Sequence, residues 1–303
     1  MEGSEKKVFA DQDDLRIQKV QQVALAGVIV NILLSIVKFT FGIWGKSQAV
    51  IADAVHSLSD LSTDFAVIFG VKVWSKPADE DHPYGHRRIE AFVTISIGIV
   101  LLMVAGGMAY HALLNMQKGD GHQPGMIALV GSVLSVFFKE ILYRWTLAAG
   151  KEAKSSALIA NAWHHRTDAL SSVPVVLAVL AAAVSPKWAF LDYIGAFVVS
   201  LFIAHAAWRI MRSAFLEMID TGTSQKGREK IYNIVMETEG VKSSHAIRSR
   251  RMGSGWYVDL HIQVDPQMSV RLGHDISEKV KRNLMDKGPD VFDVVVHLEP
   301  HEK

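Results

Sequence analysis

Apolar residues gather into six runs over the first two thirds of the chain, each long enough to cross a bilayer as a helix, which takes about 20 residues. The runs lie at Val20–Trp44, Val50–Trp74, Ile89–Asn115, Met126–Thr146, Leu158–Val184 and Trp188–Ile210. The connections after the second and fourth runs are the basic ones, with Lys72, Lys76, Arg87, Arg88, Arg144, Lys151 and Lys154. Because basic residues collect on the cytoplasmic side, we expect both termini in the cytoplasm.

A different pattern begins after Asp220. A short linker ending in a helix-capping serine, Thr221–Ser224, precedes two predicted helices and three predicted strands. These elements are expected at Gln225–Glu239, His245–Arg251, Trp256–Asp265, Val270–Lys287 and Val291–Glu299. The order α-β-β-α-β predicts a small α+β domain, ferredoxin-like, with its helices on one face of the sheet. We therefore expect a polar N-terminal tail at 1–14, a membrane domain of six helices at 15–220 and a cytoplasmic domain at 221–303.

Composition agrees with a membrane part joined to a soluble part. Of the 303 residues, 50% are hydrophobic and 21% are charged. The net charge of +1 gives no argument for a nucleic-acid partner. The absence of cysteine excludes disulfides, thiolate metal sites and cysteine nucleophiles.

Two ten-residue segments, Ile51–Asp60 and Ile159–Asp168, read as copies of each other, and both end in a histidine and an aspartate four positions apart. Residues i and i+4 of a helix share one face, so each copy directs an imidazole and a carboxylate the same way. The second and fifth runs cross the membrane in opposite directions. This predicts an inverted repeat of three helices plus three, as in transporters whose binding site lies between the repeats.

The residues that these copies contribute are His56, Asp60, His164 and Asp168. Two neutral imidazoles and two carboxylates carry a charge of −2, which a divalent metal ion would neutralise. A four-coordinate set of nitrogen and oxygen atoms suits Zn²⁺ first and also accepts Cd²⁺, Co²⁺ or Fe²⁺. Asp53, one turn before His56, is interpreted as an accessory residue on the entry path.

Histidine offers a way to couple metal to protons. Its ordinary pKa of about 6.5 lies near cellular pH, and a protonated ring cannot bind metal. We hypothesise that metal export is exchanged for proton import. Other polar residues of the runs receive simpler interpretations: His165 and Arg166 face away from His164 toward other helices, while Lys38, Lys139 and Glu140 snorkel or form ion pairs.

Taken together, the six runs, the repeated His-x-x-x-Asp and the C-terminal α-β-β-α-β pattern resemble the cation diffusion facilitator family. The Asp- and His-rich turn at Pro77–Arg88 strengthens the resemblance, which spans Leu15 to Pro300. It implies a homodimeric carrier in the lipid bilayer, not an enzyme, that exports divalent transition metals in exchange for protons by alternating access. His56, Asp60, His164 and Asp168 match the family's transport site. The two-histidine version resembles its zinc-selective branch, although related iron and manganese carriers exist.

The resemblance also implies roles outside the membrane. Asp79, His82 and His86 match a second metal site in the loop, where the residues alone fit a solvated turn equally well. A regulatory binuclear site at the dimer interface would use His245, His261, His274, His297 and Glu299. Ordinary surface histidines are the alternative there. Arg88 and Asp220 resemble a charged pair at the hinge of the dimer, with a structural role.

Three other classes stay open at this point. A membrane metalloenzyme is disfavoured by the lack of a His-Glu-x-x-His motif. A metal sensor or storage protein would leave the inverted repeat without a purpose. A channel conflicts with a tight four-ligand pocket. We expect a bacterial cytoplasmic membrane as the location, with the membrane of an internal organelle as the alternative.

Overall fold

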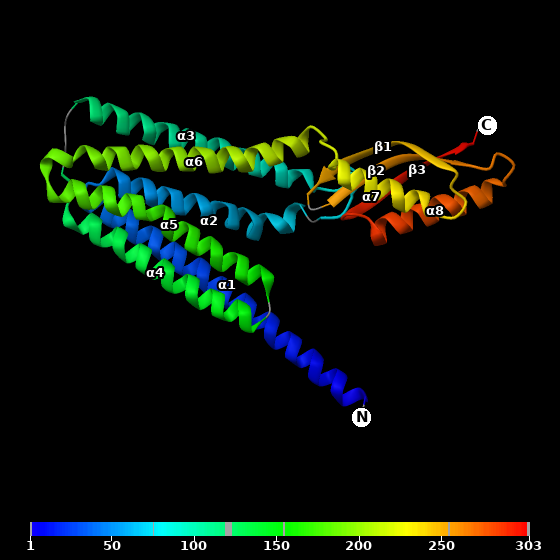
Figure 1. Cartoon of the computed structure of the whole chain (residues 1–303), viewed down its shortest axis with the longest axis horizontal. Coiled ribbons are helices and arrows are strands. Elements are labelled where there is room, and N and C mark those ends of the chain that lie inside the picture. The colour runs from blue at the N-terminus through cyan, green and yellow to red at the C-terminus, as the bar shows by residue number, and fades with distance from the viewer. Residues whose placement is uncertain (1, 75, 119–122, 154, 254, 302–303) are drawn as a thin grey trace. The chain divides into compact units, whose positions relative to one another are not determined.

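The computed structural model describes residues 2–74, 76–118, 123–153, 155–253 and 255–301 (Figure 1), without side chains at 2–21, 62–69, 71–72 and 156–157. The six apolar runs form six long helices, and the remaining elements follow in the expected order. The helices of the first part are α1 (Glu2–Trp44), α2 (Gln48–Trp74), α3 (Arg88–Lys118), α4 (Met126–Glu152), α5 (Ser156–Val184) and α6 (Phe190–Met218), with a 3₁₀ turn, η1 (Pro186–Trp188), between the last two.

Five helical segments in the described part of the chain are long and apolar enough to cross a membrane. They are Gln22–Trp44, Arg88–Lys118, Met126–Glu152, Leu158–Val184 and Pro186–Met218. Helix α2 has 27 residues, and the second half of its predicted span lies largely outside the residues whose side chains are described. The protein is therefore a multi-pass membrane protein with five or more apolar helices.

Several helices extend beyond the apolar runs that predict them. Helix α1 begins at Glu2, so residues 2–14 of the segment expected to be a polar tail are helical and continuous with the first apolar run. Helix α4 ends at Glu152 rather than Thr146, and α6 ends at Met218 rather than Ile210. The physical reason is that hydropathy reports the part of a helix that matches the bilayer, whereas backbone hydrogen bonding continues into polar sequence.

The chain folds into two compact units that are not continuous in sequence. One comprises Met1–Phe65 with Ile97–Trp208, and the other Ala66–Ser96 with Arg209–Lys303. The end of α2, the start of α3 and the end of α6 belong to the same unit as the C-terminal elements.

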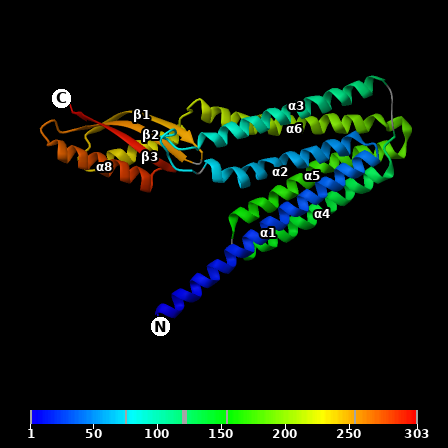
Figure 2. The same ribbon diagram turned by 180° about the vertical axis from the view of Figure 1, so that it is seen from behind.

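Small residues allow close helix packing in the first unit. Helices α1, α4 and α5 lie side by side (Figures 1 and 2). A Cβ at Gly45 would lie 2.5 Å from the Cβ of Ala128, and one at Gly131 would lie 2.6 Å from the Cβ of Phe41. Only glycine permits α1 and α4 to approach this closely. A core rich in alanine and valine, including Ala52, joins α2, α3, α4, α5 and α6.

The second unit contains a three-stranded sheet in the order β1-β2-β3. Its elements are α7 (Gln225–Met236), β1 (Ser243–Met252), β2 (Gly255–Val264), α8 (Val270–Lys287) and β3 (Val291–Pro300). Strands β1 and β2 are antiparallel, and β2 and β3 are parallel. The crossover between the parallel strands is α8, as a parallel pair requires.

Residue patterning explains this domain well. Val258, Leu260, Ile262 and Val264 are buried on one face of β2 and pack in one core with residues of α7 and α8. Alternate residues of this strand are thus buried, as expected of a strand with one face on the core. Ser224 caps α7 by accepting a hydrogen bond from the backbone N–H of Gly227, as its position before the helix predicts.

Candidate functional site

The first candidate site joins the two copies of the repeat. Asp60 on α2 and His164 and Asp168 on α5 place one ligand atom each within 4.8 Å of one another. Within α5, the Nδ1 of His164 lies 3.8 Å from an Oδ1 of Asp168, as their i, i+4 spacing allows. An imidazole nitrogen and two carboxylate oxygens at this separation can hold a divalent metal ion.

His56, the fourth residue predicted for this site, does not belong to that cluster of described residues. It lies one turn before Asp60 on α2 and is half-buried. Its Nδ1 is buried without a hydrogen-bond partner among the described residues. The structure therefore brings three of the four predicted residues together and leaves His56 beside them with an unused ring nitrogen.

A residue that the sequence does not mark as part of the site reaches it from α4. The Nζ of Lys139 lies 3.3 Å from Oδ2 of Asp168, and the two side chains are only 3% and 10% exposed. Sequence reasoning expected no more of Lys139 than snorkelling or an ion pair. The available signal was a lysine in the middle of an apolar run, where a charge is costly without a partner.

Asp53, expected on the entry path, makes a different contact. Its Oδ2 lies 2.7 Å from the Nζ of Lys38, and both side chains are buried. Ser57 and Ser172 each accept a hydrogen bond from the same Nζ at 3.1 Å, and Ser172 donates to Oδ1 of Asp53. This buried network joins α1, α2 and α5 and engages the carboxylate of Asp53 in an ion pair and a hydrogen bond.

The neighbours of His164 on α5 turn away from it, as predicted. Arg166 donates a hydrogen bond to the hydroxyl of Tyr143 on α4 at 3.1 Å and lies over its ring. His165 is 2% exposed, and neither ring nitrogen has a hydrogen-bond partner in the described part of the chain. Neither residue adds a ligand to the cluster.

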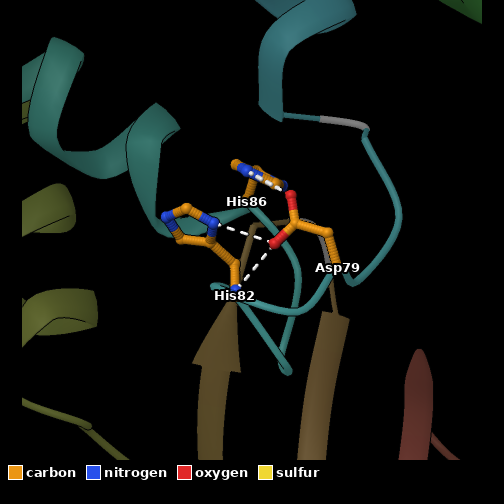
Figure 3. Close-up of side chains that lie close together, drawn as sticks. All are labelled: Asp79, His82 and His86. Atoms are coloured by element: carbon orange, nitrogen blue, oxygen red, sulfur yellow. Dashed lines mark hydrogen bonds and ion pairs between the residues drawn. The ribbon is translucent and has the colours of Figure 1, made fainter.

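The second candidate site lies in the loop between α2 and α3, where Asp79, His82 and His86 converge (Figure 3). Oδ1 of Asp79 lies 3.0 Å from Nδ1 of His82 and also accepts a hydrogen bond from the His82 backbone N–H. Oδ2 of Asp79 lies 3.4 Å from Nε2 of His86. Gly85, with a φ of +78°, reverses the chain between the two histidines.

The charge state of this loop favours metal binding. Slight desolvation acts to raise the pKa of Asp79, but hydrogen bonds from His82 outweigh it, so the pKa lies below the ordinary value. Asp79 and His82 are about half exposed, whereas His86 is only 11% exposed. At neutral pH the loop therefore presents the ionised carboxylate of Asp79 and the imidazole of His82 to solvent, with the largely buried imidazole of His86 beside them.

The third candidate site crosses the sheet. His245, His261 and His297 face one another as register partners on β1, β2 and β3. Glu299 contacts all three: its carboxylate oxygens lie 3.3 Å from Nε2 of His245, 2.7 Å from Nδ1 of His261 and 3.7 Å from Nε2 of His297. His245, His261 and Glu299 form a cluster of metal-ligand type.

The hydrogen bond with His261 is the main reason why the pKa of Glu299 lies below its ordinary value. His274, which the resemblance assigns to this site, is exposed on α8 and is not part of the cluster in the described chain. Helix α8 packs on the buried face of the sheet, while the histidines occupy the other face. Within one chain, His274 is thus separated from the other predicted ligands.

The expected charged pair between Arg88 and Asp220 is present. A guanidinium nitrogen of Arg88 lies 2.5 Å from Oδ1 of Asp220, and the side chains are 42% and 50% exposed. Asp220 adopts a φ of +56° just after α6 ends. An exposed pair of this kind contributes at most about 1 kcal/mol of stability.

Comparisons with known proteins match the chain in two consecutive parts. Residues 24–219 match the family described as cation efflux transmembrane domain, and residues 224–301 match the cytoplasmic domain of cation efflux proteins. The chain is 30% identical over 286 residues to the manganese efflux system protein MneP of Bacillus subtilis, covering 93% of this chain and 96% of that protein.

Two further relatives come from a plant and from a second bacterium. Metal tolerance protein C1 of Arabidopsis thaliana is 35% identical over 289 residues, or 90% of this chain, which spans only 61% of that longer protein. The magnetosome protein MamB of Magnetospira is 30% identical over 271 residues, covering 89% of this chain and 92% of that protein.

Proposed function

Because the chain belongs to the cation diffusion facilitator family, whose members are cation efflux transporters and not enzymes, we propose that it exports a divalent transition-metal ion from the cytoplasm. One observation carries the proposal: Asp60, His164 and Asp168, from two helices of an apolar bundle, offer ligand atoms within 4.8 Å of one another. Ionisable groups at such a place cost free energy, so their presence indicates a function.

Zinc is the favoured cargo, and manganese is the main alternative. With His56, the site offers two nitrogens and two oxygens, the set that suits zinc. Without His56, one nitrogen and two oxygens remain, and a larger share of oxygen favours manganese. The similarity to a protein named for manganese efflux supports the second possibility. Iron and cadmium are further candidates. The position of His56 in the loaded carrier therefore decides the selectivity.

Proton exchange follows from the chemistry of histidine. A metal ion binds only the neutral imidazole, so loading expels a proton from a protonated ring and a proton arriving from the other side promotes release. His164 is the residue in the cluster that would couple the two fluxes. Binding and release alternate between the two sides of the membrane, as expected of a carrier built from an inverted repeat.

The assembly proposed is a homodimer in the bacterial cytoplasmic membrane with both termini in the cytoplasm. The match of residues 224–301 to the cytoplasmic domain of cation efflux proteins supports a cytoplasmic C-terminal domain. The clusters at Asp79 and at Glu299 would bind the same metal from the cytoplasm. Because these clusters are partly exposed, they can bind ions directly from solution. Their role would be regulatory or structural.

The test is transport by the purified full-length chain in proteoliposomes, with Zn²⁺, Mn²⁺, Fe²⁺, Cd²⁺ and Co²⁺ offered in turn. Saturable uptake of at least one ion is expected, with loss of uptake in Asp168→Ala. A lumenal pH dye would report the counterflow of protons. Asp286→Ala, at an exposed position on α8, is the control for removal of a carboxylate elsewhere.

Each result discriminates between functions. Undiminished uptake in Asp168→Ala removes the cluster from the mechanism. Uptake that does not saturate indicates a channel. Binding without uptake of any ion in the panel indicates a sensor or storage protein.

A further inference from the structure

The contact between Lys139 and Asp168 has no part in the metal chemistry described so far. Lys139 extends from α4, and its Nζ lies 3.3 Å from Oδ2 of Asp168. Asp168 is at the same time one of the three carboxylate and imidazole groups of the candidate transport site. A fixed cation of the protein therefore shares a carboxylate with the proposed cargo.

Burial makes this contact significant. The side chains of Lys139 and Asp168 are only 3% and 10% exposed. A buried charge is tolerated only when it is paired, and removal of one partner leaves the other uncompensated at a cost of several kcal/mol. While it is ionised, Asp168 thus needs a positive partner: the ammonium group of Lys139 or a metal ion.

The charge of Lys139 also acts on the rest of the site. It interacts electrostatically with Asp60, the ligand that α2 contributes. When both are ionised, the carboxylates of Asp60 and Asp168 carry two negative charges, which a divalent ion alone would neutralise. With Lys139 charged, the loaded site has one positive charge in excess, so the lysine opposes retention of the ion.

We propose that Lys139 is a tethered competitor of the transported ion: it pairs with Asp168 when the carrier is unloaded and is displaced from it on loading. The proposal rests on the proposed function. Lys139 then acts as a positioning residue that weakens metal binding and so permits release of the ion. It also keeps the buried carboxylate of Asp168 paired while the unloaded carrier returns. Weak binding at the site then favours transport, because a carrier that holds its ion too tightly turns over slowly.

The chain offers a matched comparison. Lys38 is also a buried lysine paired with an aspartate, at 2.7 Å from Asp53, but Asp53 lies outside the ligand cluster. Loss of either lysine removes a positive charge from the membrane domain. Of the two, Lys139 alone is paired with a residue of the ligand cluster, so its loss leaves the carboxylate of Asp168 available to the metal ion. The two positions therefore separate competition for a carboxylate from a general effect of charge.

The experiment compares Lys139→Met, Lys139→Gln and Lys139→Arg in the full-length chain. Equilibrium binding of Zn²⁺ and Mn²⁺ is measured for each variant with and without Asp60→Ala. The binding that Asp60→Ala removes is the binding at the transport site. Neutral variants are expected to bind about tenfold tighter or more, as removal of one nearby positive charge predicts. In proteoliposomes they are expected to have a lower KM and a lower kcat. Lys139→Arg keeps the charge and is expected to bind as the wild type does.

The direction of the effect distinguishes the proposal from a damaged fold, since misfolding weakens metal binding and cannot tighten it. If Lys139→Met fails to assemble, Lys139→Gln, which keeps a hydrogen-bond donor for Asp168, decides. Unchanged or weaker binding in the neutral variants of a wild type that transports metal overturns the inference and leaves the proposed function intact. Equal tightening in Lys38→Met also overturns it. A wild type with no Asp60-dependent binding rejects the proposed function itself.

Discussion

Ser47, just before α2, donates a hydrogen bond from its Oγ to Oδ1 of Asp192 near the start of α6, at 2.5 Å. The same carboxylate accepts from the backbone N–H of Gln48 at 2.6 Å and from that of Ala49 at 3.4 Å. Asp192 therefore caps a helix far away in sequence, and it does so at a buried position. Because α2 contributes Asp60 to the candidate transport site, this cap helps to place a candidate ligand.

The first prediction concerns this cap. Asp192→Ala leaves the N-terminal N–H groups of α2 without their acceptor, and we expect a loss of about 1–3 kcal/mol of stability. Asp192→Asn keeps one acceptor oxygen and should lose less. Thermal unfolding in detergent, followed by circular dichroism, measures both. Equal stability of wild type and Asp192→Ala would show that the cap contributes nothing.

The second prediction concerns the ion pair of Lys38 and Asp53. Lys38→Met leaves a buried carboxylate uncompensated, for which we expect a loss of about 3–5 kcal/mol. Adding Asp53→Leu removes the orphaned charge and should recover most of the stability. The same unfolding assay applies. A double variant no more stable than Lys38→Met would contradict the pairing as the source of the loss.

The third prediction concerns the loop site. Asp79→Asn removes the ionised carboxylate that both histidines contact, so the loop should lose its bound metal ion. Equilibrium dialysis with Zn²⁺ and with Mn²⁺ should then give one ion fewer per chain than the wild type. Asp81→Asn, in the same loop but outside the cluster, is the matched control and should bind normally. Equal stoichiometry of the two variants would reject the site.

The fourth prediction concerns pH. The pKa of Glu299 is depressed from its ordinary value of 4.5, chiefly by the hydrogen bond with His261. A carboxyl group with a depressed folded-state pKa stabilises the fold above its unfolded pKa, and this contribution disappears as pH falls through the folded-state value. The wild type should therefore be more stable than Glu299→Gln at pH 6, and the difference should shrink below about pH 4.5.

Differential scanning fluorimetry of both chains with a metal chelator, from pH 6 to about pH 3.5, checks this pH dependence. A difference in stability that is constant over that range would mean that ionisation of Glu299 plays no part. Chelation removes bound metal as a second cause of pH dependence, since metal binding also weakens as histidines are protonated.

Local sequence was sufficient for many elements. The helix predicted at Val270–Lys287 has those bounds in the structure, because its serine cap and its apolar spacing are local signals. The alternation in β2 identified the buried face in the same way. The repeated His-x-x-x-Asp segments predicted that α2 and α5 would meet, and Asp60, His164 and Asp168 do lie together. The family, too, was recognisable from motifs alone.

Other relationships depend on how the helices are rotated against one another. The periodicity of one helix does not contain this information. Periodicity shows that His56 and Asp60 share a face of α2, but packing decides which of them approaches α5. The partners of Lys38 and Lys139 were equally open, because a buried lysine requires a carboxylate without indicating which one. The sequence determined the elements, the repeat and the ligand types, since these follow from neighbours along the chain. Only the tertiary structure decided that Asp168 is shared between the candidate ligand cluster and Lys139, because that contact forms between α4 and α5 and follows from neither helix alone.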